Sequence, residues 1–71
     1  MKDNVVFVCY HKKRYHVWEA TMSSLMGEKD FALDKKSHIY KVFKTRGRAL
    51  CYAHDMARDV ISEHGVMEVS L

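Results

Sequence analysis

The sequence predicts an α+β fold, a two-layer sandwich in the order β-β-β-α-β, with one helix of about residues 45–64 packed on one face of a mostly antiparallel sheet. Three observations predict it. Runs of β-branched and aromatic residues mark three strands before residue 44. An apolar stripe with helical spacing follows. A short apolar run then comes directly after Gly65. With its 71 residues the chain is expected to form a single domain, residues 1–71.

The first two strands are expected at residues 5–10 and 15–21. The first run, VVFVCY, is apolar at every position, which is typical of a central strand with the helix on one side. Between the strands, the loop HKKR at 11–14 lacks the Asn-Gly or Asp-Gly pair of a two-residue turn. We therefore expect either a four-residue loop or a longer strand pair.

The stretch 23–37 has the weakest pattern in the chain. Residues 23–27 fit one helical turn or a bend, and Phe31 and Leu33 alternate with other residues as in a short edge strand. A third strand is expected at 38–43, leading straight into the helix.

The helix has clear start and stop signals. Thr45 is expected as the N-cap, and Gly65 as the left-handed residue after the last turn. Gly47 disagrees with a helical first turn, so either the helix begins near Arg48 or Gly47 allows a close approach. The fourth strand is expected at 66–69. The buried stripe comprises Ala49, Leu50, Ala53, Met56, Ala57, Val60 and Ile61.

The sheet face away from the helix is expected to be partly open to solvent or to a partner. Of the larger aromatic residues, Trp18, Tyr10, Tyr15 and Tyr40, at least two should pack under the helix, with Trp18 in the core. An aromatic residue left on the open face would be an anchor for a partner protein.

Composition limits the function classes. The net charge of +3 and the pI of about 9.0 permit a nucleic-acid or acidic-protein partner without demanding either. No apolar segment approaches the roughly 20 residues of a membrane span, so no membrane partner is expected. The two cysteines form no disulfide framework, and we expect them reduced in a cytoplasmic protein.

The sharpest charge feature is the loop at 11–16, where three fixed cations stand between aromatic and histidine residues. Such a loop could hold phosphates and stack a base, or bind an acidic protein surface. Alternatively it is a solvated turn whose charges prevent edge aggregation. Lys35, Lys36 and Lys41 could extend the patch. The predicted partner-binding residues are Lys12, Lys13, Arg14, Tyr15, Lys44, Arg46 and Arg48.

Enzymatic and metal chemistry have weaker support. Cys9-x-His11 and Cys51-x-x-His54 contain zinc-type ligands, but their spacing matches no standard site. The sequence holds no nucleophile-elbow, phosphate-loop or zinc-protease motif. Three helix carboxylates, Asp55, Asp59 and Glu63, alternate with Arg58 and are interpreted as surface charge. We expect a non-enzymatic protein without a cofactor or metal; a metal or redox role for the cysteines and histidines is the least favoured alternative.

The segment FKTRGRALCYAHDMA resembles a pattern in very small phage and bacterial ββαβ proteins, such as phage-encoded inhibitors of host RNA polymerase. It is also similar to other small phage host-takeover proteins, including anti-CRISPRs. The resemblance covers residues 38–69 and rests on Phe43, Thr45, Ala49, Leu50, Ala53 and Ala57.

The single compact domain, the lack of catalytic motifs and the basic hairpin predict a small regulatory binding protein, monomeric or homodimeric. The resemblance implies that it is phage-encoded and acts in the host cytoplasm. It would dock on a host protein or nucleoprotein complex, with transcription machinery or a defence system as first candidates. Direct nucleic-acid binding through the basic hairpin is the alternative.

Overall fold

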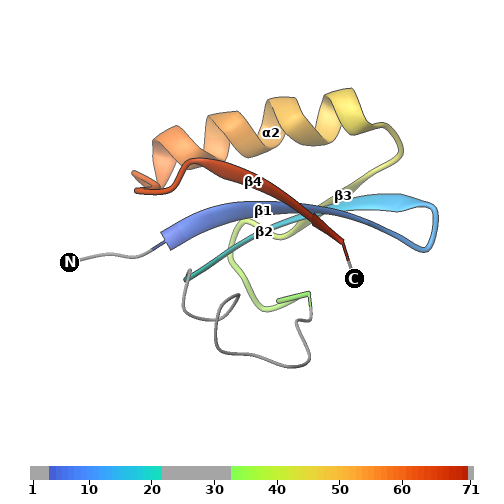
Figure 1. The fold of residues 1–71 in the computed structure, drawn as a ribbon, viewed down its shortest axis with the longest axis horizontal. Helices are drawn as coiled ribbons and strands as arrows, with labels where there is room; N and C mark the ends of the chain where they lie inside the picture. Colours follow the sequence, from blue (N-terminus) through green and yellow to red (C-terminus); the bar gives the residue numbers. More distant parts are fainter. Residues whose placement is uncertain (1–3, 22–32, 71) are drawn as a thin grey trace.

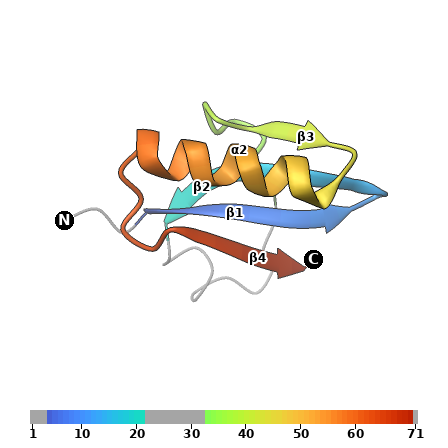
Figure 2. The same ribbon diagram turned by 90° about the horizontal axis from the view of Figure 1, so that it is seen from above.

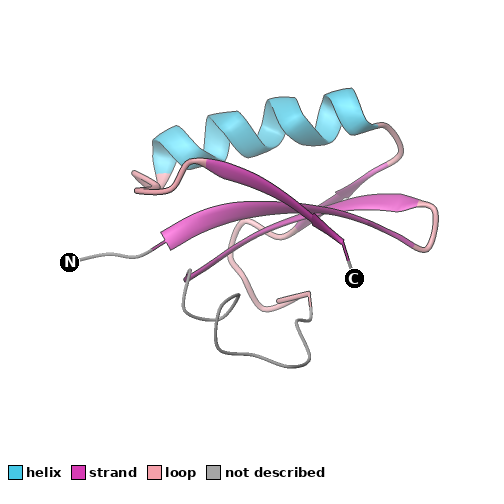
Figure 3. Cartoon of the chain, viewed as in Figure 1, coloured by secondary structure: helices cyan, strands magenta, loops and turns pink. Residues whose placement is uncertain are grey.

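The computed structural model describes residues 4–21 and 33–70, and it confirms the expected fold class. One helix packs as a layer on a four-stranded sheet (Figure 1). Helix and strands are separate layers in the same view coloured by secondary structure (Figure 3). The elements are β1 (Asn4–His11), β2 (Arg14–Thr21), β3 (Lys41–Phe43), α2 (Arg46–Asp59) and β4 (Val66–Ser70).

The sheet has the strand order β3-β2-β1-β4, so β1 is central as its apolar sequence predicts. β1 pairs antiparallel with β2, β2 pairs antiparallel with β3, and β4 pairs parallel with β1. The sheet is therefore mixed, and its two edge strands run in the same direction. Figure 2 shows α2 lying over the sheet between these two edges.

Of the two expected forms of the β1–β2 hairpin, a four-residue loop or a longer strand pair, the structure has the longer strand pair. His11 pairs with Arg14, which leaves a turn of two residues, Lys12 and Lys13. Their φ angles are 51° and 65°, and positive values at both central residues define a type I′ turn. Two lysines here replace the usual Asn-Gly pair, and a left-handed conformation costs about 1–2 kcal/mol per non-glycine residue.

α2 begins where the sequence predicts and ends earlier. The Thr45 hydroxyl accepts a hydrogen bond of 3.4 Å from the Arg48 N–H, so Thr45 is the N-cap. Gly47 lies inside the first turn, and a Cβ built on it would meet no atom within 4 Å. The later helix start offered for Gly47 is therefore wrong, and no described part of the chain makes the close approach that was the other explanation.

The predicted helix end at residue 64 is wrong, because α2 stops at Asp59. The Ser62 N–H donates to the Ala57 carbonyl at 2.9 Å, and the Ile61 N–H donates to the Arg58 carbonyl at 3.3 Å. This is a Schellman motif with Ile61, not Gly65, at the left-handed position (φ 51°). Gly65 also has a positive φ, 66°, but it serves the turn into β4.

Two hydrophobic clusters lie on opposite faces of the sheet. The first joins Val6, Val8 and Val17 to Ala49 and Ala53 of α2. The second cluster contains Val5, Phe7, Cys9 and Trp18, all 0–1% exposed, with Leu33 and Tyr40 among the residues packed against them.

The expectation of a partly open sheet face is therefore wrong. An all-apolar β1 supplies side chains to both faces in alternation, and the structure buries both. Trp18 is a core residue as expected, but on the face opposite α2. Of the four aromatic residues considered, Tyr15 alone packs against the helix-side cluster, so the expectation of two is also wrong.

The third strand is shorter than predicted. It spans Lys41–Phe43, because the segment before it folds into turns closed by hydrogen bonds from the Ser37 N–H to the Asp34 carbonyl and from the Tyr40 N–H to the Ser37 carbonyl. The turn or bend predicted at 23–27 lies outside the described residues, as do residues 30–32 of the short edge strand expected at 30–34. The described part of that segment, Leu33 and Asp34, is not in a strand.

Candidate binding surface at the hairpin end

The pairing register brings the two predicted basic segments to one end of the sheet. Tyr15, next to the lysine turn, pairs with Phe43, the last residue of β3. The chain then enters α2 through Lys44 and Thr45, so the N-terminus of α2 lies at the same end as the hairpin (Figures 1 and 2). This end, the hairpin end, carries the predicted cations Lys12, Lys13, Arg14, Lys44, Arg46 and Arg48.

Charge is segregated along the molecule. Among the described residues, the hairpin end has six cations and one carboxylate, Glu68 in β4. The other described carboxylates lie in the last half of α2, in the turn after it, beside Asn4 at the start of β1, or in the turns before β3. These are Glu19, Asp34, Asp55, Asp59 and Glu63.

Arg46 differs from the other cations because it is paired. Its Nε and Nη2 donate to Glu68 Oε1 and Oε2 at 3.0 and 2.7 Å, a bidentate bridge between α2 and β4. The hydrogen bond and the opposite charge raise the pKa of Arg46 and lower the pKa of Glu68. Within the described part of the chain, Lys12, Lys13, Lys44 and Arg48 have no carboxylate partner.

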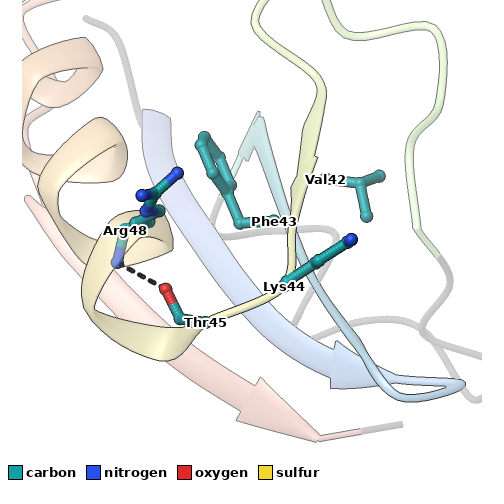
Figure 4. A pocket seen from close by; sticks show the side chains of 5 residues that line it. All are labelled: Val42, Phe43, Lys44, Thr45 and Arg48. Atoms are coloured by element: carbon teal, nitrogen blue, oxygen red, sulfur yellow. Dashed lines mark hydrogen bonds between the residues drawn. The ribbon is translucent and has the colours of Figure 1, made fainter.

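An open groove of about 460 Å³ lies where β3 meets α2, and Figure 4 shows its lining. Val42 and Phe43 supply apolar surface, and Thr45 lies at the helix start. Lys44 and Arg48 place positive charge on the groove walls. The sequence predicted both cations but not Val42, whose 39% exposure is high for a valine in a strand. Its outward position depends on the β3 register, which local sequence does not contain.

Lys41 is held beside the groove by aromatic rings. Its Nζ lies 5.7 Å from the Phe43 ring centre and 5.3 Å from that of Tyr52, within the range of cation–π attraction. The Tyr52 hydroxyl donates to the Ile39 carbonyl at 2.8 Å, which fixes the ring. Lys41 therefore supports the groove wall.

An aromatic pair accompanies the lysine turn. Tyr10 and Tyr15 are directly opposite on β1 and β2, with ring centres 4.8 Å apart. Tyr15 is half-buried in the helix-side core, whereas Tyr10 is 55% exposed. The accessible ring is thus Tyr10, one of the four aromatic residues considered as anchors but not one of the predicted partner-binding residues. A prediction of the two-residue turn would have set the β1–β2 register and so placed Tyr10 opposite Tyr15.

Several predicted groupings do not form. Lys35 and Lys36 lie beside Ser37, whose hydroxyl accepts from the Glu19 N–H at the opposite end of β2, so they do not extend the basic surface. Cys9 belongs to the buried cluster on the face away from α2, whereas Cys51 is exposed on α2, so these two do not converge on a metal. No group of three metal-type ligands occurs within residues 4–21 and 33–70. Asp55 pairs with Arg58, as expected of surface charge.

No family model matches the chain, and no curated protein or solved structure matches it at a significant level. The resemblance to phage inhibitors therefore stays a prediction. Residues 4–21 and 33–70 contain no candidate membrane-spanning helix.

Proposed function

We propose that this chain is a small, non-enzymatic binding protein that docks its hairpin end on an acidic surface of a partner protein or nucleoprotein complex. The observation that carries the proposal is the charge segregation: six cations and one carboxylate share one end of the described structure. Such a surface steers a negatively charged partner during encounter and fixes its orientation once bound.

The local energetics of this end support a binding role. Lys12 and Lys13 occupy left-handed conformations that glycine or asparagine would adopt at lower cost. The first turn of α2 contains no acidic residue and carries Arg46 and Arg48 instead, although the helix macrodipole favours negative charge there. Both choices reduce stability, and strained or unfavourable placements of this kind are concentrated at functional sites.

The resemblance supplies the first candidate partners. Transcription machinery and defence complexes both expose acidic or nucleic-acid-bound surfaces, and a regulatory protein that blocks such a surface needs no catalytic group. This proposal includes a cytoplasmic location.

Affinity capture from bacterial lysate tests the proposal with a control matched in charge. The variant Lys12→Glu/Lys13→Glu reverses two charges at the hairpin end, and Lys35→Glu/Lys36→Glu reverses two charges at the other end. We expect one partner to be enriched by the unchanged protein and by the second variant, and lost with the first. Equal capture by both variants would rule out docking through the hairpin end.

A second candidate, direct binding of single-stranded nucleic acid, is favoured by the exposed Tyr10 ring beside the lysine turn. It predicts that a fluorescent oligonucleotide binds at about 50 mM salt and releases steeply towards about 200 mM, because each neutralised phosphate releases counterions. It also predicts weaker binding by Tyr10→Ala. A shallow salt dependence, or no binding at the lower salt, would remove this candidate.

A further inference from the structure

The hydrogen-bonding pattern of the sheet shows which backbone N–H and C=O groups of β3 point outward. In a two-residue hairpin, the residues that flank the turn form a hydrogen-bonded pair, here His11 and Arg14. Hydrogen-bonded and non-bonded pairs then alternate along β2. The N–H groups of Tyr15 and Val17 therefore point towards β3. The Glu19 N–H continues this phase, because it donates to the Ser37 hydroxyl at 3.0 Å.

This alternation fixes the orientation of β3. Phe43 and Lys41, opposite Tyr15 and Val17, use their backbone groups to bind β2. Val42, opposite His16, must point its N–H and carbonyl away from the sheet. By the same alternation, the backbone groups of Lys44 also point outward. Figure 2 shows β3 at the edge, with no described strand beyond it.

We propose that the outer edge of β3 accepts an extended acidic segment of the partner protein as an additional strand. The inference rests on the proposed function and names its docking mode. In strand addition, main-chain hydrogen bonds supply affinity and pockets for alternate side chains supply specificity. Here Val42 offers the main-chain groups, and the groove beside it receives side chains from one face of the added strand.

The positive charge around the groove favours an acidic segment as the added strand. Lys44 and Arg48 line the groove without a carboxylate partner among the described residues, and Lys41 lies at the start of the strand. A second copy of β3 would bring like charges together, which is unfavourable for directly opposed cross-strand residues. Val42 and Lys44 point to one side of β3, and Phe43 and Arg48 to the other, so each side offers one apolar side chain and one cation (Figure 4). A partner segment that carries both aliphatic and acidic side chains would meet both kinds of residue. The groove chemistry thus favours an acidic peptide over a homodimer contact.

The test is an amide chemical-shift titration of the full chain with a defined probe, an octapeptide of alternating glutamate and valine. The control peptide replaces each glutamate with lysine. We expect the acidic peptide to shift the amides of Val42, Lys44 and Arg48 in a saturable way, and the basic peptide to leave them unchanged. No shift with the acidic peptide, or shifts confined to other elements, would overturn the proposal.

A proline variant isolates the backbone contact. Val42→Pro removes an outward N–H that β2 does not use, together with the valine side chain, and edge strands tolerate proline; Val42→Thr keeps that N–H and the side-chain shape. We expect Val42→Pro to weaken the peptide about tenfold, as the loss of one hydrogen bond implies, and Val42→Thr to bind nearly normally. Equal binding by the two variants would contradict strand addition.

A charge swap gives a second measurement that does not depend on proline. Lys44→Glu/Arg48→Glu should lose the acidic peptide and gain the basic one; binding of the acidic peptide that survives this swap would overturn the inference. Shifts of the same amides by an oligonucleotide, without any response to the acidic peptide, would also overturn it and favour nucleic acid. In the capture experiment, a partner that depends on Lys12 and Lys13 but not on the Val42 N–H would leave the proposed function standing and remove strand addition.

Discussion

The two ends of the sheet are built on opposite principles. At the end where β1 begins, Asn4 is 7% exposed and its side chain is fully engaged. Its Nδ2 donates to Glu19 Oε2 at 2.9 Å and to the Val60 carbonyl at 3.1 Å, and its Oδ1 accepts from the Glu63 N–H at 3.1 Å. At the hairpin end, by contrast, Lys12, Lys13, Lys44 and Arg48 are exposed and have no carboxylate partner among the described residues.

One end of the sheet therefore stabilises the fold, and the other exposes charged groups to a partner. The Asn4 end joins β1, β2 and the turn after α2 through one buried amide, so its polar groups hold the fold together. The hairpin end accepts left-handed lysines and cations near the positive pole of a helix. If the comparison is right, substitutions at the Asn4 end change stability without binding, and substitutions at the hairpin end can raise stability while removing binding.

The largest expected effect is at Asn4. Asn4→Ala removes three side-chain hydrogen bonds and leaves the Val60 carbonyl and the Glu63 N–H without their partner. Because a buried unsatisfied polar group costs about 1–3 kcal/mol, we expect a loss of about 2 kcal/mol in the free energy of unfolding. Urea denaturation followed by Trp18 fluorescence measures it, with the exposed Lys35→Ala as control. A loss below about 0.5 kcal/mol, the usual range of surface substitutions, would show that Asn4 does not hold this end of the sheet together.

Asn4 also shows why the helix end was beyond sequence analysis. The start of α2 depends on Thr45 and Arg48, three residues apart, so a local pattern predicts it. The turn after α2 is fixed by a side chain 56 residues away from Val60 in the chain, and no local pattern contains that contact. A glycine at position 65 was the better local candidate for the stop, yet tertiary hydrogen bonds placed Ile61 there.

The candidate site divides in the same way. Its cations follow from composition and from the strand–helix order, which the sequence predicted. The groove could not be predicted in this way, because it depends on the pairing of Tyr15 with Phe43. The ion pair of Arg46 with Glu68 could not be predicted either, because it joins residues 22 apart in the chain. The sequence therefore predicted where positive charge gathers along the chain, but not which cations are neutralised or that Val42 and Tyr10 are exposed.

The second effect concerns the lysine turn. Replacing Lys12-Lys13 with Asn-Gly keeps the type I′ geometry and removes the left-handed strain, and the greater freedom of glycine in the unfolded chain offsets part of the gain. We expect a net stabilisation of about 1–2 kcal/mol in urea denaturation, together with loss of partner capture. A variant that is both more stable and fully competent in capture would show that the lysines are not displayed for binding.

A smaller effect is expected at Ile61, which shares the same backbone conformation at the other end. Ile61→Gly relieves a β-branched residue at φ 51°, 78% exposed, and should stabilise the protein by about 0.5–1 kcal/mol after the entropy of glycine is included. Capture should be unchanged, which makes this variant the matched control for the lysine turn. Lost capture by Ile61→Gly would place part of the interface at the Asn4 end, so binding would not be confined to the hairpin end.

The smallest effect sharpens the account of the hairpin end itself. The Arg46 hydrogen bonds lower the pKa of Glu68 from its ordinary value of 4.5, so the pair stabilises the fold fully above pH 4.5 and loses this contribution as the pH falls through the lowered value. Both side chains are exposed, so the stability difference between Glu68→Gln and the unchanged protein should be small at neutral pH and should vanish in acid.

Binding should respond in the opposite sense to stability. Glu68→Gln frees the Arg46 guanidinium and removes the one described carboxylate of the hairpin end, so an acidic partner should be captured more strongly although the fold is slightly weaker. Titration of the Glu68 carboxyl by NMR checks the direction of the pKa, and capture at two salt concentrations checks the charge effect, which salt should reduce. Weaker capture by Glu68→Gln would mean that the Arg46–Glu68 bridge, by fixing the first turn of α2 against β4, matters more to the partner than the charge it neutralises.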